Sequence, residues 1–156
     1  MRLPAGKRAV AVAAGGGGLE GGHTAFVLRD AAAGDGAADE LWACGYGRWG
    51  QLGTRAYTHI SEPKALGALS KLREWDNAEK KVVSIGVEKL ACGKRHTAAL
   101  LKTGNVFVWG WNDHGQLGSG GASGTHTPTL VRSPPELRFA VMRGLACGPN
   151  STAVWS

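Results

Sequence analysis

Cysteine is scarce in this chain, and no two cysteines lie close together in the sequence. Only three occur among 156 residues, Cys44, Cys92 and Cys147, and they lie 48 and 55 positions apart. An odd number with no close pair argues against a disulfide framework and against the paired ligand spacing of a zinc site. We therefore expect a reducing compartment and not secretion.

Long apolar runs and concentrated charge are also missing. No stretch approaches the about 18 consecutive apolar residues of a membrane span, which leaves only peripheral membrane association open. Charged residues make up 19% and apolar residues 43% of the chain, a balance that excludes a disordered charged tail. The net charge of +6 is spread along the sequence, whereas a nucleic-acid surface gathers Lys and Arg on one stripe. Nucleic acid is thus not an expected partner.

The motifs of common catalytic and cofactor sites do not occur. The sequence has no GxxxxGK[ST], GxSxG or HExxH motif and no paired-carboxylate arrangement. The run GGGGLEGG at 15–22 precedes HTAFVL, which has the pattern of a strand, so a flexible insertion is favoured over a phosphate loop. We predict no enzyme activity, no cofactor and no metal site.

Glycine is abundant, and part of it belongs to a repeated phrase. The 25 glycines favour tight turns between short strands over long helices. GQLG occurs twice, 65 residues apart, as Gly50-Gln51-Leu52-Gly53 and as Gly115-Gln116-Leu117-Gly118. Each copy follows a short apolar segment, LWACG or VFVWG, and precedes a proline by ten residues.

A second phrase alternates with the first. LACGKRHTAAL at 90–100 recurs as LACGPNSTAVW at 145–155, and a looser copy lies at 12–28. A fixed alternation of two phrases is typical of an array of one supersecondary unit. The predicted fold class is all-β, with strands at 9–14, 24–28, 41–45, 82–87, 90–92, 97–101, 106–110, 141–147 and 152–155. A three-residue recurrence of Leu and Trp predicts one short helix within 69–81.

The residue types suit the blades of a propeller. Small residues such as those of LACG fit strands crowded near a central axis, while the rings of Trp42 and Trp109 are expected to fill the wedge between neighbouring sheets. The glycines of GQLG permit turns with positive φ. Leu52 and Leu117 are expected to plug the gap against the next blade. The amides of Gln51 and Gln116 are expected to satisfy backbone groups of the turn.

Histidine and cysteine recur at repeat positions, which favours structural roles. His23 and His96 hold the same place in the second phrase, and Ser151 holds it in the third copy. Cys92 and Cys147 likewise hold the same repeat position and are predicted to be small buried apolar residues. A nucleophilic cysteine would need a setting that lowers its pKa. We favour the structural interpretation for all four.

The two phrases resemble the repeat of the regulator of chromosome condensation family. The motifs that carry the resemblance are ACGxxHTAAL, then VFVWGWNxxGQLG, then a proline ten residues on, and they cover nearly the whole chain from about residue 9. The resemblance implies a β-propeller, which has seven blades in that family. More narrowly, GRWGQLGTRAYTHISEP and the LSKLREW insertion resemble fungal mitochondrial members that are associated with the inner membrane and with respiratory-complex assembly.

Only about two and a half repeats are present. We predict an N-terminal extension at 1–8, then blades at 9–81 and 82–140 and an incomplete blade at 141–156. The segment AVAVAA is predicted to be the first strand and not part of a transit peptide, because VAAG aligns with the later LACG. An open array leaves strand edges unpaired. The chain is therefore expected to be a fragment, a truncated gene model or a partial blade set that further repeats or another chain completes.

The leading functional prediction is a non-catalytic protein-interaction scaffold with an unidentified protein partner. The resemblance suggests a mitochondrial assembly factor, with the nucleus or cytoplasm as alternative compartments. Loops that depart from the repeat are the candidate contacts, namely Tyr57 and His59 in one loop and Lys71, Arg73 and Trp75 in another. The alternatives are guanine-nucleotide exchange on a small Ran-like GTPase, as founding family members perform, and a chromatin-associated binding module.

Overall fold

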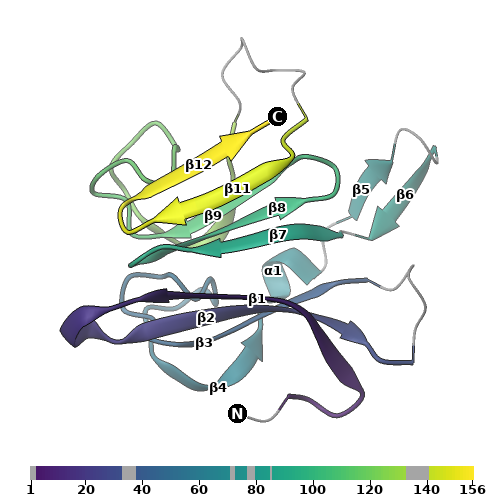
Figure 1. Cartoon of the computed structure of the whole chain (residues 1–156), viewed down its shortest axis with the longest axis horizontal. Coiled ribbons are helices and arrows are strands. Elements are labelled where there is room, and N and C mark those ends of the chain that lie inside the picture. The colour runs from purple at the N-terminus through teal and green to yellow at the C-terminus, as the bar shows by residue number, and fades with distance from the viewer. Residues whose placement is uncertain (1–2, 33–37, 71–72, 77–79, 85, 133–140) are drawn as a thin grey trace.

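The computed structural model is built almost entirely of antiparallel sheets (Figure 1). It describes residues 3–32, 38–70, 73–76, 80–84, 86–132 and 141–156. Two sheets have four strands each, in the order β1-β2-β3-β4 and β10-β9-β8-β7, and two have two strands each, β11-β12 and β5-β6. The fold class is all-β, as the sequence predicts, with two four-stranded blades followed by half of a third.

The glycine-bounded phrases form the inner strands of each blade. The first blade contains β1 (Lys7–Gly16), β2 (Gly22–Asp30), β3 (Glu40–Gly45) and β4 (Ile60–Ala65). The second contains β7 (Val87–Cys92), β8 (His96–Leu101), β9 (Val106–Gly110) and β10 (Thr125–Leu130). The third consists of β11 (Gly144–Gly148) and β12 (Ser151–Trp155). A short 3-10 turn, η1 (Gly18–Glu20), lies between β1 and β2.

The first strands of the three blades, β1, β7 and β11, lie next to one another (Figure 1). Their backbones approach closely, since the amide of Gly16 donates to the carbonyl of Gly93 at 3.0 Å. A Cβ on Gly15 would collide with that carbonyl and with Cys92, so glycine is required at this approach. Small residues therefore gather where the blades converge.

Two apolar clusters fill the wedges between consecutive blades. The first lies between blades one and two and contains Val27, Leu41, Ala43, Leu52, Leu66, Leu69, Val87, Ala99, Leu101, Phe107 and Trp109. The second lies between blades two and three and contains Ala98, Leu100, Val106, Val108, Leu117, Met142 and Leu145. Strand alternation explains the division, because successive residues of β8 and β9 point to opposite faces of their sheet.

The described part of the insertion after β4 is mostly not helical. It begins with one helical turn, α1 (Gly67–Ser70), and continues as a hairpin of β5 (Arg73–Asp76) and β6 (Lys81–Ser84). Leu66 and Leu69 are buried in the first cluster, but Trp75 pairs across the hairpin with Val82. Among the described residues, the helix expected within 69–81 is present only as the end of α1. The strands β5 and β6 form instead because aromatic and β-branched residues favour paired extended backbone.

The strand register separates two ends of the blades. Gly45 lies opposite His23, and Gly110 lies opposite His96, so the connections that follow β3 and β9 share an end with the turns after β1 and β7. We call this end the turn face, formed by residues 16–22, 46–59, 93–95, 111–124 and 149–150. Because β4 runs back from it, α1 and the β5–β6 hairpin lie at the opposite end (Figure 1).

Candidate protein-interaction surface and the blade joints

The first GQLG turn forms a joint between blades one and two. The backbone carbonyl of Gln51 accepts hydrogen bonds from Thr97 Oγ1 at 2.8 Å and from the indole Nε1 of Trp109 at 2.9 Å. Within the turn, the side-chain Oε1 of Gln51 accepts from the amide of Trp49 at 2.9 Å. In the second copy, Gln116 Oε1 accepts from the amide of His114 at 3.0 Å. Both side chains thus satisfy turn backbone, the role that the sequence predicts for them.

A histidine–threonine bond crosses each blade boundary. His23 Nε2 lies 2.9 Å from Thr97 Oγ1, and His96 Nε2 lies 3.0 Å from Thr152 Oγ1. In both pairs the histidine belongs to one blade and the threonine to the next. The His-Thr step recurs in the sequence, but the threonine of the following blade was not predicted as the partner of the histidine. A threonine recurring one residue after the histidine position was the available signal.

Burial shifts the pKa values of the histidines and cysteines at the joints, and it favours the uncharged form of each. Burial lowers the pKa of His23 to about 4, and it also lowers the pKa of His96. Burial raises the pKa of the Cys92 thiol to about 12 and that of Cys147 to about 11. Burial also raises the pKa of the Cys44 thiol. Thiols with raised pKa values remain protonated at neutral pH and are poor nucleophiles.

Trp42 does not occupy the place of Trp109. In the register, Trp109 lies opposite Thr97 in blade two, and the equivalent residue opposite Thr24 in blade one is Cys44. Trp42 is half-buried and donates its indole N–H to Glu40 Oε2 at 3.0 Å. Trp109 is fully buried against blade one. Both rings were expected to fill the wedge between sheets; Trp109 does so, whereas Trp42, two register positions away, is not part of the buried cluster.

Leu52 and Leu117 occupy equivalent places in successive wedges. Leu52 is buried in the first apolar cluster with Trp109, and Leu117 is buried in the second with Val106 and Val108. Each side chain therefore reaches from its GQLG turn into the space before the next blade. This is the plug that the sequence predicts at both positions.

The last glycine of each GQLG copy provides a matched test of the joint. Gly53 (φ 67°) and Gly118 (φ 60°) share a left-handed backbone, but a Cβ on Gly53 would lie 2.8 Å from Trp109 Nε1, whereas the nearest atom to one on Gly118 is Val131 Cγ1 at 3.9 Å. Both Ala variants carry similar backbone strain, and only Gly53→Ala adds overpacking. We expect Gly53→Ala to lower the free energy of unfolding by about 1–3 kcal/mol more than Gly118→Ala in urea denaturation. Equal losses of unfolding free energy in the two variants would contradict the close packing of Trp109 against Gly53.

The turn face carries an arginine held between two tryptophans. The guanidinium carbon of Arg95 lies 4.6 Å from the ring centroid of Trp49 and 4.6 Å from that of Trp111. His114 meets Trp111 edge-on at 4.8 Å between centroids. Cation–π contacts of this kind stabilise a guanidinium on an aromatic face. We call Arg95, Trp49 and Trp111 the Arg95 stack. Trp49 comes from the GQLG region of blade one, and the other two come from two turns of blade two.

Two further ring pairs extend the turn face. Tyr57 contacts His126 at 4.7 Å between ring centroids, and Tyr46 contacts His59 at 4.4 Å. Tyr57 and His59, both predicted contact residues, are exposed here. Two of the other predicted contacts lie elsewhere. Arg73 and Trp75 are exposed on the hairpin at the opposite end, and Lys71 lies outside the described residues.

The described part of the chain contains no group of three or more His, Cys, Asp or Glu side chains placed to hold a metal ion. None of its helices has the length and apolar character needed to cross a membrane. The described geometry therefore consists of packed joints between blades and one aromatic, arginine-containing face.

Two blades joined by a buried turn, and a half blade joined to them by the equivalent histidine–threonine bond, define a repeat protein of the β-propeller class. Family profiles described as the Regulator of chromosome condensation (RCC1) repeat match residues 38–100 and 103–155, and a second profile of that description matches residues 87–116. These matches cover more than half of the chain. The chain belongs to the RCC1-repeat family.

Relatives of known name carry the same repeat within longer proteins. Mouse RCC1 domain-containing protein 1 is 37% identical over 101 residues, which is 65% of this chain and 23% of that protein. Human E3 ubiquitin-protein ligase HERC2 is 30% identical over 116 residues, 74% of this chain and 2% of the ligase. Human Protein RCC2 is 32% identical over 117 residues, 74% of this chain and 19% of that protein. The chain spans less than a quarter of each of these three relatives.

Solved structures show the same fold. The human WBSCR16 structure matches 100% of this chain and 33% of its own, with a TM-score of 0.67 and 24% identity. Prp20p from Saccharomyces cerevisiae, described with its binding to Gsp1p and histones, matches 99% of this chain and 32% of its own, with a TM-score of 0.68 and 20% identity. The chain is therefore a partial β-propeller that spans about a third of either structure.

Proposed function

We propose that this chain is a non-catalytic protein-binding scaffold whose contact surface is the turn face. The Arg95 stack is the observation that carries the proposal. Arginine, tryptophan and tyrosine dominate the energetic centres of protein interfaces, and here Arg95 is ordered by two rings before any partner arrives. Side chains that are already ordered lose less conformational entropy on binding.

Exposure of the neighbouring rings supports the same surface. Tyr57 is 54% exposed although its ring already contacts His126, and His114 is exposed beside Trp111. A half-exposed tyrosine offers both apolar area and a hydroxyl for hydrogen bonding. Loops on a rigid scaffold are also where binding residues commonly lie. The turn face combines these features around the stack.

Four residues of types that catalysis often uses have structural roles here, which supports the non-catalytic part of the proposal. His23 and His96 are engaged in blade joints. Cys92 and Cys147 are held as thiols by their raised pKa values. The two histidines are thus engaged in hydrogen bonds between blades, and the two cysteines are poor nucleophiles.

The narrower role that we propose is an assembly factor for mitochondrial complexes. It is supported by the resemblance of GRWGQLGTRAYTHISEP to fungal mitochondrial members, a segment that includes Trp49 and Tyr57 of the turn face. The alternative, exchange on a Ran-like GTPase, is supported by the fold shared with Prp20p and its Gsp1p binding. Release of a fluorescent guanine nucleotide from such a GTPase distinguishes the two, because an assembly factor would leave the release rate unchanged.

Matched variants at the two ends of the blades test the contact surface. Immobilised chain is incubated with solubilised mitochondrial membranes or with nuclear extract, and bound proteins are quantified by mass spectrometry. We expect Tyr57→Ala and Trp111→Ala to reduce specific partners at least fivefold, the loss expected for a contact worth more than about 1 kcal/mol. Trp75→Ala, at the opposite end and 57% exposed, is the control. Loss on Trp75→Ala alone would place the contact on the hairpin instead.

A further inference from the structure

Arg55 has a backbone conformation that the second repeat gives to a glycine. Its φ is 63°. It lies two residues after Gly53, and the same position after Gly118 is held by Gly120, whose φ is 80°. A side chain strains the backbone in this left-handed region, whereas glycine adopts it readily. An arginine therefore stands at a position where the fold alone favours glycine.

Blade two holds the backbone of Arg55 in this conformation. The amide of Arg55 donates to the carbonyl of His126 on β10 at 3.0 Å. Two residues further on, the ring of Tyr57 contacts the ring of His126 at 4.7 Å between centroids. The side chain of Arg55 is nonetheless exposed. Strained residues that their surroundings fix are common at ligand-binding sites, which makes this guanidinium a candidate contact.

The turn face carries an excess of positive charge. Its segments contain four basic and two acidic residues, which gives a net charge of +2. The basic residues are Arg48, Arg55, Lys94 and Arg95, and the acidic residues are Glu20 and Asp113. The first three of the basic side chains are exposed and form no ion pair with the described side chains.

Two basic residues near the opposite end of blade one are paired with carboxylates of this chain. Lys7 Nζ lies 2.9 Å from Glu40 Oε1, and Arg29 Nη2 lies 2.7 Å from Asp39 Oδ1. The register of β1, β2 and β3 places both pairs away from the turn face. The charge of the turn face is thus not balanced in the same way, and a partner that supplies carboxylates would complement it.

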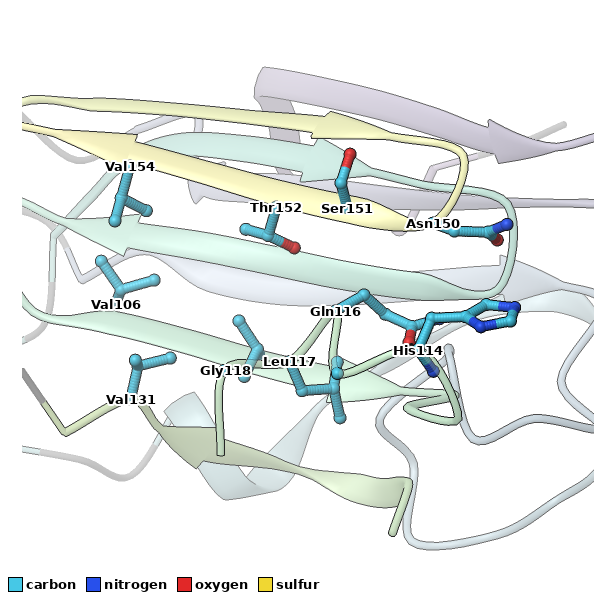
Figure 2. Close-up of a pocket in the computed structure, with 12 residues that line it drawn as sticks. Val106, His114, Gln116, Leu117, Gly118, Val131, Asn150, Ser151, Thr152 and Val154 are labelled. Carbon is cyan, nitrogen blue, oxygen red and sulfur yellow. Dashed lines mark hydrogen bonds between the residues drawn. The ribbon is translucent and has the colours of Figure 1, made fainter. Parts of the chain in front are cut away.

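The turn that contains Arg95 is held in place on both sides. The amide of Lys94 donates to the carbonyl of Pro149 at 3.0 Å, which fixes the turn against blade three. Figure 2 shows Asn150 of that third blade and His114 at the same end of the sheets. The guanidinium of Arg95 lies between its two tryptophan rings. A guanidinium stacked on its faces keeps its N–H donors in its own plane, in the fork that matches a carboxylate.

We propose that the turn face binds an acidic segment of a partner protein, with Arg55 and Arg95 as the charged contacts. This inference rests on the turn face being the contact surface of the chain, and it adds the chemistry of the partner. Carboxylates of the segment pair with the two guanidinium groups, and a neighbouring apolar side chain packs on the exposed ring of Tyr57. A nucleic acid is disfavoured, because its phosphates call for a denser row of Lys and Arg than this face supplies.

An acidic probe peptide tests the chemistry of the partner. A fluorescein-labelled peptide of the sequence Glu-Glu-Gly-Phe-Glu-Glu is titrated with the full chain at low ionic strength, and fluorescence anisotropy is expected to show saturable binding. A peptide with Gln in place of each Glu is expected to bind about tenfold more weakly. Equal affinity of the two peptides, or no saturable binding of the acidic one, would overturn the proposal. Tighter binding of a labelled single-stranded oligonucleotide, with a steeper salt dependence, would assign the face to nucleic acid and overturn it too.

Arg55→Gly separates binding from folding. Glycine adopts the left-handed backbone readily, so the urea midpoint of this variant is expected to equal or exceed that of the unaltered chain. Its affinity for the acidic peptide is expected to fall about fivefold. Arg73→Gln removes the same charge from an exposed position at the opposite end and is the control, with an expected change below about twofold. Equal losses of affinity in these two variants would reduce the effect to net charge and refute the assigned contacts.

Arg95→Lys keeps the positive charge but lacks the planar fork, and it is expected to bind the acidic peptide about fivefold more weakly. Capture of partners by Tyr57→Ala and Trp111→Ala distinguishes this inference from the proposed function. Loss of captured partners, together with unchanged peptide binding by Arg55→Gly and Arg95→Lys, would refute the acidic segment but not the contact surface. Capture that is unchanged in both ring variants would refute the contact surface, and this inference with it.

Discussion

Replacing Trp109 by alanine is expected to lower the free energy of unfolding by about 3–5 kcal/mol, the cost of removing a large buried ring. The side chain is 0% exposed and packs with Leu52 and Leu66 between blades one and two. Its removal also deprives the Gln51 carbonyl of one of two donors. Urea denaturation followed by circular dichroism measures the change, with the slope showing whether compactness is retained.

Two further substitutions separate the ring from its N–H group. Trp109→Phe keeps an apolar ring but removes the indole donor, and about 1–2 kcal/mol is expected to be lost. Trp75→Ala removes an indole that is 57% exposed and is expected to change stability by less than about 0.5 kcal/mol. If Trp109→Ala and Trp75→Ala have equal effects, the joint described here is not what holds the blades together.

Acidification from pH 6.5 to pH 4 is expected to destabilise the chain through His23. Its pKa is lowered from 6.5 to about 4 by burial, so the folded state binds fewer protons than the unfolded state in this window. Stability from this group is therefore complete above pH 6.5 and is lost as the pH falls toward 4. The difference between the pKa of His23 in the unfolded and folded states corresponds to about 3 kcal/mol. His96, also lowered by burial, acts in the same direction.

Substitution of the histidine tests this assignment. His23→Gln keeps a polar side chain within reach of Thr97 but does not titrate, so stability should vary less between pH 6.5 and 4 than in the unaltered chain. His114→Gln, on the exposed turn face, is the control and should retain the original dependence. Urea denaturation at several pH values provides the measurement. An unchanged pH dependence in His23→Gln would assign the acid sensitivity to other groups.

The strands that the sequence predicted best are those with small and apolar residues bounded by glycine. β8, β9 and β12 lie within a residue of their expected positions. β4 and β10, with the sequences ISEPKA and THTPTL, were not predicted as strands. Each contains a proline and little apolar alternation, which is tolerated because both are the outer strands of their sheets. Edge position depends on pairing between distant segments, so local sequence does not reveal it.

The candidate interaction surface was predicted only in part. Tyr57 and His59 were proposed because their loop departs from the repeat, and they lie on the turn face. The Arg95 stack was not predicted. Trp49, Arg95 and Trp111 stand in three different turns: the pairing of β8 with β9 places Arg95 beside Trp111 within blade two, and the packing of blade one on blade two adds Trp49. No pattern within one repeat contains all three.

The amino-acid sequence by itself determined the repeat: the two phrases, the turns with positive φ and the residues whose side chains enter the wedges. The tertiary structure alone decided what each copy contacts. Gly53 and Gly118 share a phrase and a backbone conformation, yet a Cβ on Gly53 would lie 2.8 Å from Trp109 Nε1, whereas the nearest atom to one on Gly118 is Val131 Cγ1 at 3.9 Å. The physical reason is that each joint is completed by the following blade, so identical turns acquire different surroundings through non-local packing.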